Sequence, residues 1–127
     1  LCINVAINPI CAIAGVPNGI LLEQPGLGDV ALSALLESRS VAEAAGRKVP
    51  EADALVEGFQ QVVAATARNR CSMLQDLIRG RPTEVDALTG QVLRTAEQVG
   101  VSTPTVTTLD ALVRGIEGSP PQSLSEF

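Results

Sequence analysis

The 127-residue sequence contains no histidine, no tryptophan and no tyrosine, and only two phenylalanines. Without histidine, the chain lacks both the commonest metal ligand and the base of a Ser-His or Cys-His pair. Its three cysteines, Cys2, Cys11 and Cys71, are widely spaced and form no CxxC pair, which argues against a zinc site or a disulfide framework. We therefore expect no metal, and reduced thiols that are at least half-buried, as is typical of a cytoplasmic protein.

Basic charge is also scarce. The formal net charge is −5, and Lys48 is the only lysine among nine basic residues. Because no basic face is backed by aromatic residues, a nucleic-acid partner is not expected. The first charged residue is Glu23, so the opening could in principle span a membrane. Three asparagines, two prolines and the lack of basic or aromatic anchors argue against a span or a secretion signal, and we predict that residues 1–22 are buried within protein.

Small aliphatic residues dominate what remains, since 46% of the chain is hydrophobic but only 2% is aromatic. Such a composition favours closely packed helices with a core of Ala, Val, Leu and Ile. Apolar residues recur at helical spacing, and no strand pattern or internal repeat is present. The fold class is therefore predicted to be all-α: a compact multi-helix bundle formed by residues 1–118, followed by a flexible Pro- and Ser-rich tail over residues 119–127.

Local signals predict where the helices begin and end. Pro9 lies inside the first helix, a Pro-Asn-Gly turn at 17–19 ends it, and Pro50 is expected in the first turn of the third. Thr83 is expected to cap a helix, with Asp86 completing a capping-box-like arrangement. The predicted helices cover residues 2–14, 27–46, 50 to about 68, 71–78, 83–100 and 103–118.

Two polar constellations interrupt this apolar pattern. Asn4 and Asn8 are four residues apart, so they share one helix face. They either brace neighbouring helices, as most buried amides do, or point into a cleft and bind a polar ligand. Asn69, Ser72 and Asp76 follow an i, i+3, i+7 spacing that places them on one helical face. Glu84 is predicted in the first turn of a helix, where a carboxylate can simply stabilise that helix. A structural role therefore stays open for Glu84 beside a functional one.

No self-sufficient active site is visible in the residues alone. The sequence offers no catalytic pair of carboxylates and no GxGxxG phosphate loop, because PGLGD at residues 25–29 has too few glycines and follows no strand.

Five motifs in order nevertheless resemble the C-terminal helical domain of the ketopantoate reductase family, over Leu1 to about Glu117. They are NxxxNP at residues 4–9, PNG at 17–19, SMxQD at 72–76, GRxTExDxLxG at 80–90 and GVxTPxxxxL at 100–109. The resemblance implies a fold related to the C-terminal domain of 6-phosphogluconate dehydrogenase. It also implies an NADPH-dependent oxidoreductase that converts 2-dehydropantoate to pantoate, in pantothenate and coenzyme A biosynthesis, in a cleft facing an N-terminal Rossmann domain.

Carried onto this sequence, the resemblance implies roles for six residues. Asn4, Asn8 and Asn18 would contact the substrate, and Asn69 and Ser72 would hydrogen-bond its carboxylate or hydroxyl groups. Glu84 would interact with a catalytic lysine and with the cofactor side of the site. NADP(H) would be bound mainly by the Rossmann domain.

The catalytic lysine of the family stands immediately before the position of Leu1, and Lys48 matches none of the motifs. The Rossmann domain is likewise absent from the 127 residues. We therefore expect a fragment of a larger enzyme that is inactive alone, with its own N-terminal domain and a 2-keto acid as partners. Alternatives are a paralogue that reduces another 2-keto acid, or a non-catalytic helical module for dimerisation or interaction. A homodimer is compatible with the sequence.

Overall fold

The computed structural model describes residues 1–118; the tail predicted over 119–127 lies outside them. The described residues form seven α-helices and one 3-10 turn without any strand, which confirms the all-α prediction. The elements are α1 (Cys2–Ala14), α2 (Ile20–Glu23), α3 (Pro25–Ala44), α4 (Ala52–Ala65), α5 (Ser72–Ile78), η1 (Val85–Ala87), α6 (Thr89–Val99) and α7 (Pro104–Gly118). None of the helices in residues 1–118 combines the length and hydropathy needed to cross a bilayer.

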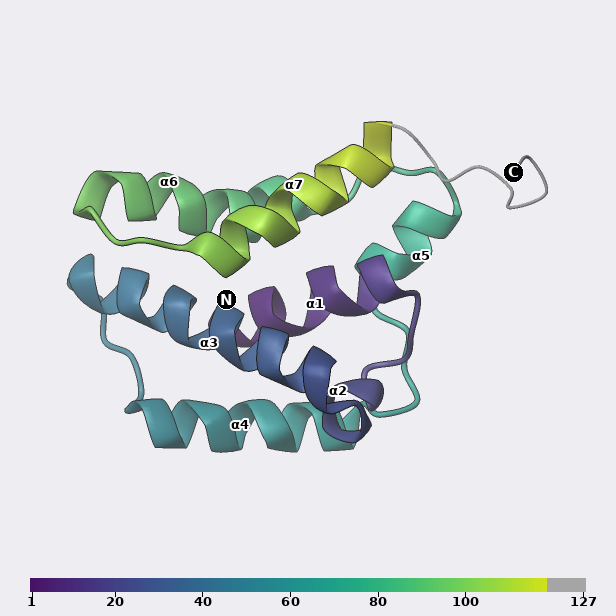
Figure 1. The fold of residues 1–127 in the computed structure, drawn as a ribbon, viewed down its shortest axis with the longest axis horizontal. Helices are drawn as coiled ribbons and strands as arrows, with labels where there is room; N and C mark the ends of the chain where they lie inside the picture. The colour runs from purple at the N-terminus through teal and green to yellow at the C-terminus, as the bar shows by residue number, and fades with distance from the viewer. Residues whose placement is uncertain (119–127) are drawn as a thin grey trace.

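Helix α1 is the centre of the bundle. It contacts α3, α4, α5 and α7, and Figure 1 shows α4 on one side of the α1–α3 pair and α6 with α7 on the other. Its uncharged sequence follows from this position, because Val5, Ala6 and Cys11 are completely buried. The three thiols are free, with Cys11 and Cys71 buried and Cys2 half-buried, as predicted.

The core is built mainly from the small aliphatic residues that the composition predicts. Ala31 and Ala34 of α3 are fully buried, and their size allows α3 to approach its neighbours closely. Phe59 and Met73 are the large exceptions, each 2% exposed. The buried residues of the described helices form one continuous core.

Most helix boundaries agree with the prediction, and Gly46 is a clear case. α3 ends at Ala44, and Gly46 takes a left-handed conformation with φ +79°. Its N–H donates to the Glu43 carbonyl at 3.0 Å, and the next N–H, of Arg47, donates to the Ala42 carbonyl at 3.0 Å. Glycine adopts this conformation without the steric cost that a Cβ atom brings, and the two bonds satisfy carbonyls at the helix end.

The third predicted helix is shorter at both ends than expected. α4 begins at Ala52, so Pro50 precedes the helix; its carbonyl accepts a 2.7 Å hydrogen bond from Arg39 Nε on α3. α4 ends at Ala65, and the loop that follows turns to accept backbone hydrogen bonds from the 17–19 loop. In both cases a tertiary hydrogen bond overrides local helical preference.

The predicted helix over residues 83–100 is interrupted. Residues 85–87 form the 3-10 turn η1, and α6 begins only at Thr89. The Thr83 hydroxyl does accept from the Val85 N–H at 3.2 Å, but the capping box was a wrong prediction. The Asp86 carboxylate instead accepts hydrogen bonds from Arg94 and Arg114, at 2.9 and 3.1 Å. The short helix α2 was also missed, because four residues are too few to show a helical period.

Candidate functional site

Asn4 and Asn8 lie on the face of α1 that is turned away from the core. Asn4 is exposed and Asn8 is partly exposed, whereas Val5, Ala6 and Ile7 between them are buried. Neither amide hydrogen-bonds to another residue within 1–118, so the two side chains do not brace neighbouring helices. Each amide carries donors and an acceptor that remain available to a ligand.

Three of the predicted site residues meet in one narrow depression. Its lining residues are Asn8, Ser72, Met73, Asp76, Glu84 and Leu88. Asn8 comes from α1, Ser72 from α5, and Glu84 from the segment before η1, so the depression is assembled from parts that are distant in the sequence. One carboxylate in it is already engaged, because Asp76 forms a 3.0 Å ion pair with Arg81.

Cys71 holds α5 against α1 at this depression. Its Sγ accepts from the Leu74 N–H at 3.4 Å and so caps α5, and its thiol donates to the Asn8 carbonyl at 3.6 Å. Burial raises the pKa of the Cys71 thiol, which keeps the donating proton in place. The thiol therefore positions Ser72, the next residue, beside Asn8.

Asn18 is placed differently from the exposed amides. It is only 7% exposed, and its Nδ2 donates to the Thr66 hydroxyl at 3.0 Å, which is the bracing role expected of a buried amide. Its Oδ1 is buried and has no hydrogen-bond partner among the described residues. The backbone N–H of Asn18 also donates to the carbonyl of Asn69, at 3.0 Å. Asn18 thus fastens the 17–19 loop to the end of α4.

Asn69 does not share a helical face with Ser72 and Asp76. It lies in the loop between α4 and α5, so the predicted i, i+3, i+7 face holds only for Ser72 and Asp76. Its side chain is exposed, and it does not line the depression around Asn8. The helical interpretation failed because Asn69 supplies a carbonyl to Asn18, which requires the chain to leave the helix.

Glu84 also differs from its prediction, because it precedes a three-residue 3-10 turn and not the first turn of a long helix. Its carboxylate is exposed and accepts no hydrogen bond from another residue that the structure describes. A helix-stabilising role is therefore weakly supported, since a three-residue turn has little dipole to stabilise. The carboxylate remains available at the edge of the depression.

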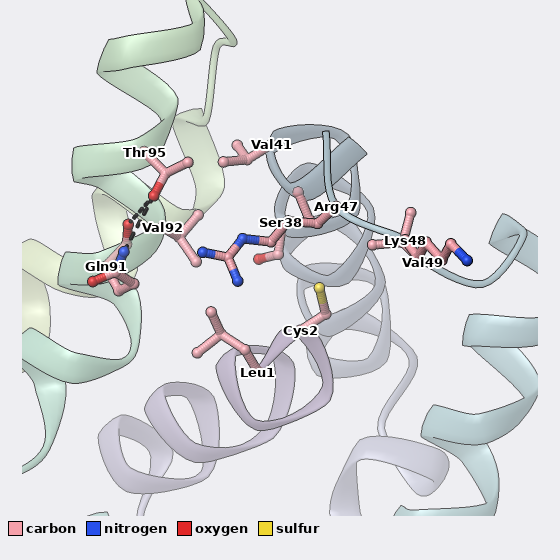
Figure 2. Close-up of a pocket in the computed structure, with 11 residues that line it drawn as sticks. Leu1, Cys2, Ser38, Val41, Arg47, Lys48, Val49, Gln91, Val92 and Thr95 are labelled. Carbon is pink, nitrogen blue, oxygen red and sulfur yellow. Dashed lines mark hydrogen bonds between the residues drawn. The ribbon is translucent and has the colours of Figure 1, made fainter. Parts of the chain in front are cut away.

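A larger cavity of about 460 Å³ lies elsewhere, at the beginning of α1 between α3 and α6 (Figure 2). None of the six predicted site residues lines it. No local sequence pattern predicts this cavity, because it depends on how far the helices extend past one another. We take the smaller depression as the candidate site, although it has no room for a water-sized group by itself, since it brings together Asn8, Ser72 and Glu84, whose side chains have no hydrogen-bond partner within residues 1–118.

The described residues do not form a dinucleotide cradle. Gly28, in the glycine-containing segment at 25–29, instead lies against α2, where a Cβ atom would come within 2.7 Å of the Leu21 carbonyl oxygen. Gln24 caps α3 by accepting from the Leu27 N–H at 2.7 Å. These residues serve the junction of α2 and α3, and do not fit a phosphate-binding loop.

The sequence of residues 1–117 matches the family described as ketopantoate reductase PanE/ApbA C terminal. The 2-dehydropantoate 2-reductase of Archaeoglobus fulgidus is 43% identical over 115 residues, which cover 91% of this chain and 38% of the relative. The Vibrio cholerae enzyme of the same name is 40% identical over 119 residues, or 94% of this chain and 40% of the relative. The chain thus spans about two-fifths of the length of these curated relatives.

Solved structures show the same relationship. A ketopantoate reductase from Ralstonia eutropha superimposes with a TM-score of 0.85 at 32% identity, covering 92% of this chain and 39% of that one. D-mandelate dehydrogenase in complex with NADH and anilino(oxo)acetate superimposes with a TM-score of 0.85 at 26% identity, covering 93% and 65%.

Proposed function

This chain belongs to the family of ketopantoate reductase C-terminal domains, and on that basis we propose that it supplies half of the substrate site of a 2-dehydropantoate 2-reductase. One observation carries the proposal. Asn8, Ser72 and Glu84, which occupy three separate family motifs, meet in one depression. The remaining parts of the enzyme would come from the longer protein, whose reductase activity this chain does not have alone.

The side chains suit the substrate. 2-Dehydropantoate has a carboxylate, a ketone and a hydroxyl group, and an amide or a serine hydroxyl can donate to one of these while accepting from another. We assign the carboxylate to the side of Asn4, Asn8 and Ser72. Glu84 can only accept hydrogen bonds when ionised, so it would repel that carboxylate and suits a substrate hydroxyl or a lysine ammonium.

The catalytic lysine would stand one position before Leu1. On a continued helix that position lies one turn before Asn4 and two turns before Asn8, so all three share a face. Asn69 would add a side chain from the 66–71 loop. Asn18 would contribute its unpaired Oδ1, which a substrate hydroxyl can reach only if the 17–19 loop moves, because the atom is buried. NADP(H) would be held mainly by an N-terminal Rossmann domain, in a cytoplasmic enzyme.

A paralogous activity on another 2-keto acid is the second candidate. It is favoured by the superposition on D-mandelate dehydrogenase, which covers 93% of this chain. The substrates of both candidate activities carry a carboxylate, which would bind to the same side of the site. They differ in the chemical group next to the ketone.

A fusion protein tests the proposal. This chain replaces the matching part of the Archaeoglobus fulgidus relative, and NADPH oxidation is measured with 2-dehydropantoate and with benzoylformate. We expect turnover of 2-dehydropantoate by the fusion and none by the 127-residue chain. A fusion that unfolds cooperatively and binds NADPH but reduces neither acid would refute the proposal, and a preference for benzoylformate would favour the second candidate.

Two substitutions in the fusion locate the site. Ser72→Ala and Asn8→Ala should each lower kcat/KM about 5- to 150-fold, which corresponds to about 1–3 kcal/mol for a lost polar contact. Ser33→Ala and Gln60→Ala are the matched controls, because both residues are exposed and lie outside the depression. Wild-type kinetics in both site variants would show that the two side chains do not bind substrate.

A further inference from the structure

The side-chain amide of Asn18 has one polar atom that is satisfied and one that is not. Its Nδ2 donates to the Thr66 hydroxyl at 3.0 Å, whereas its Oδ1 is buried and has no partner among residues 1–118. A buried acceptor without a donor is costly, and the partner that such an atom usually finds is water or a ligand group. The two ends of this amide therefore have different surroundings.

Thr66 fixes which end of the amide faces it. Its hydroxyl has a single proton, which it donates at 2.7 Å to the Val62 carbonyl, one turn earlier in α4. The Thr66 oxygen can then only accept a hydrogen bond from Asn18. An amide turned the other way would place Oδ1 against an oxygen that has no proton to donate. Nδ2 therefore faces Thr66, and Oδ1 remains as an acceptor on the opposite side.

Three hydrogen bonds join the 17–19 loop to residues 66–69. Besides the side-chain bond, the N–H groups of Asn18 and Gly19 donate to backbone carbonyls of the second segment, at 3.0 and 2.9 Å. Figure 1 shows the chain after α1 and the chain after α4 running side by side near α2. We expect the two segments to move as a unit, so a movement that uncovers Oδ1 leaves the amide oriented by Thr66.

The segment after α4 also brings Asn18 close to the candidate site. Asn69 accepts from the Asn18 N–H. Two residues further along the chain, the Cys71 thiol donates to the Asn8 carbonyl at 3.6 Å. The Cα atoms of two residues so close in the chain are at most about 7 Å apart. Asn18 therefore lies near the depression that Asn8 and Ser72 line.

We propose that Thr66 determines substrate specificity by holding Asn18 so that its Oδ1 accepts a hydrogen bond from the hydroxyl group of a 2-keto acid. This inference rests on the proposed function, because it takes the ligand to be the substrate of that site. Oδ1 can accept but not donate, so a methyl group in place of the hydroxyl leaves the acceptor unpaired. Thr66 itself touches no substrate and acts through Asn18, so it is a positioning residue.

Two acids that differ only in the hydroxyl group test this role. They are 2-dehydropantoate and its deoxy form, 3,3-dimethyl-2-oxobutanoate. We measure kcat/KM for both acids with the fusion protein and with its Thr66→Val variant. Valine has nearly the shape of threonine but offers the amide no acceptor, so Asn18 can turn. We expect kcat/KM to fall about fivefold or more for 2-dehydropantoate and to stay within about twofold for the deoxy acid.

Thr66→Ser and Thr108→Val are the matched controls. Serine keeps the hydroxyl oxygen, so Thr66→Ser should retain the preference for 2-dehydropantoate. The Thr108 hydroxyl makes the same kind of bond, to the Pro104 carbonyl at 2.9 Å, but it is exposed on α7 and accepts from no other residue that the structure describes. Thr108→Val should leave kcat/KM for both acids within about twofold.

An equal loss of kcat/KM for both acids in Thr66→Val would overturn the inference, because Thr66 would then only brace the loop. An unchanged preference in an active fusion rejects this inference alone and leaves the proposed function standing.

A calorimetric measurement covers the case of an inactive fusion. Binding of pantoate is compared with binding of its deoxy analogue, 2-hydroxy-3,3-dimethylbutanoate, in the presence of NADP⁺. A preference for pantoate that Thr66→Val abolishes would support the role of Thr66 and reject the proposed reductase function alone. Equal affinities for the two acids, or no binding of either, would overturn the inference.

Discussion

Helix α7 begins against a carboxylate that comes from α3. Glu37 Oε2 accepts from the Thr105 N–H at 3.0 Å, and Oε1 accepts from the Val106 N–H at 2.9 Å. Both donors belong to the first turn of α7, where N–H groups have no acceptor within the helix. Glu37 therefore caps a helix that lies 68 residues further along the chain.

We predict that Glu37→Ala strongly destabilises the fold. Hydrogen bonds to charged groups contribute about 1.5–3 kcal/mol each, whereas loss of a capping side chain costs about 0.5–2 kcal/mol in total. Water can replace the bond at half-buried Thr105 but not at fully buried Val106. We therefore expect a loss of about 2–3 kcal/mol in the free energy of unfolding, which lowers Tm by about 8–12 °C for a chain of this size.

Urea unfolding followed by circular dichroism measures this loss. Glu37→Gln should lose about half as much, because one carbonyl oxygen can still accept one of the two bonds. Glu97→Ala is the control, since Glu97 is exposed on α6 and pairs with no other residue in the part that the structure describes. A free energy of unfolding for Glu37→Ala within about 0.5 kcal/mol of the control would contradict the capping role.

Two further predictions concern a tight contact and an ion pair. Gly19→Ala should cost about 1–3 kcal/mol in urea unfolding, because its Cβ atom would lie 2.8 Å from the Ala67 Cβ. Gly115→Ala has open space around it and lies in α7, so it should instead stabilise the fold by up to about 1 kcal/mol, because alanine favours a helix more than glycine does. The hydrogen bond from Arg114 is the main cause that lowers the pKa of Asp86 below its ordinary 3.8, so Asp86 stabilises the fold above that pH and loses this contribution as the pH falls further. Asp86→Asn should therefore lower Tm at pH 6 more than at pH 2; an equal shift at both would contradict this.

The sequence predicts the fold class well because helical period and helix-ending signals are local. Pro104 at the start of α7 and Gly46 beyond α3 were identified from their own chemistry. The wrong predictions of helix boundaries and caps arise from contacts between residues that are distant in the sequence. Arg39 binds the carbonyl of Pro50, and Asp86 turns to two arginines distant in the sequence, neither of which a local pattern contains.

The candidate site was only partly predictable for the same reason. The four-residue spacing placed Asn4 and Asn8 on one face of α1, and the structure exposes that face. The position of Ser72 beside Asn8 depends on the thiol of Cys71, whose contact with α1 spans 63 residues. The assignment of these residues to a substrate came from the resemblance of the motifs, because spacing alone left a structural role open.

The central position of α1 also limits which amino-acid substitutions in it are tolerated during evolution. Its inner face holds Val5 and Ile10 in the core, and its outer face presents Asn4 and Asn8, so the position of this one helix sets both the core packing and the placement of the two amides. A displacement of about 1 Å in an active site can cost about 100-fold in rate. If Asn4 and Asn8 bind substrate as proposed, catalysis constrains evolutionary drift on the inner face of α1, and conservative core replacements there should be eliminated by lost turnover well before the protein loses its ability to fold.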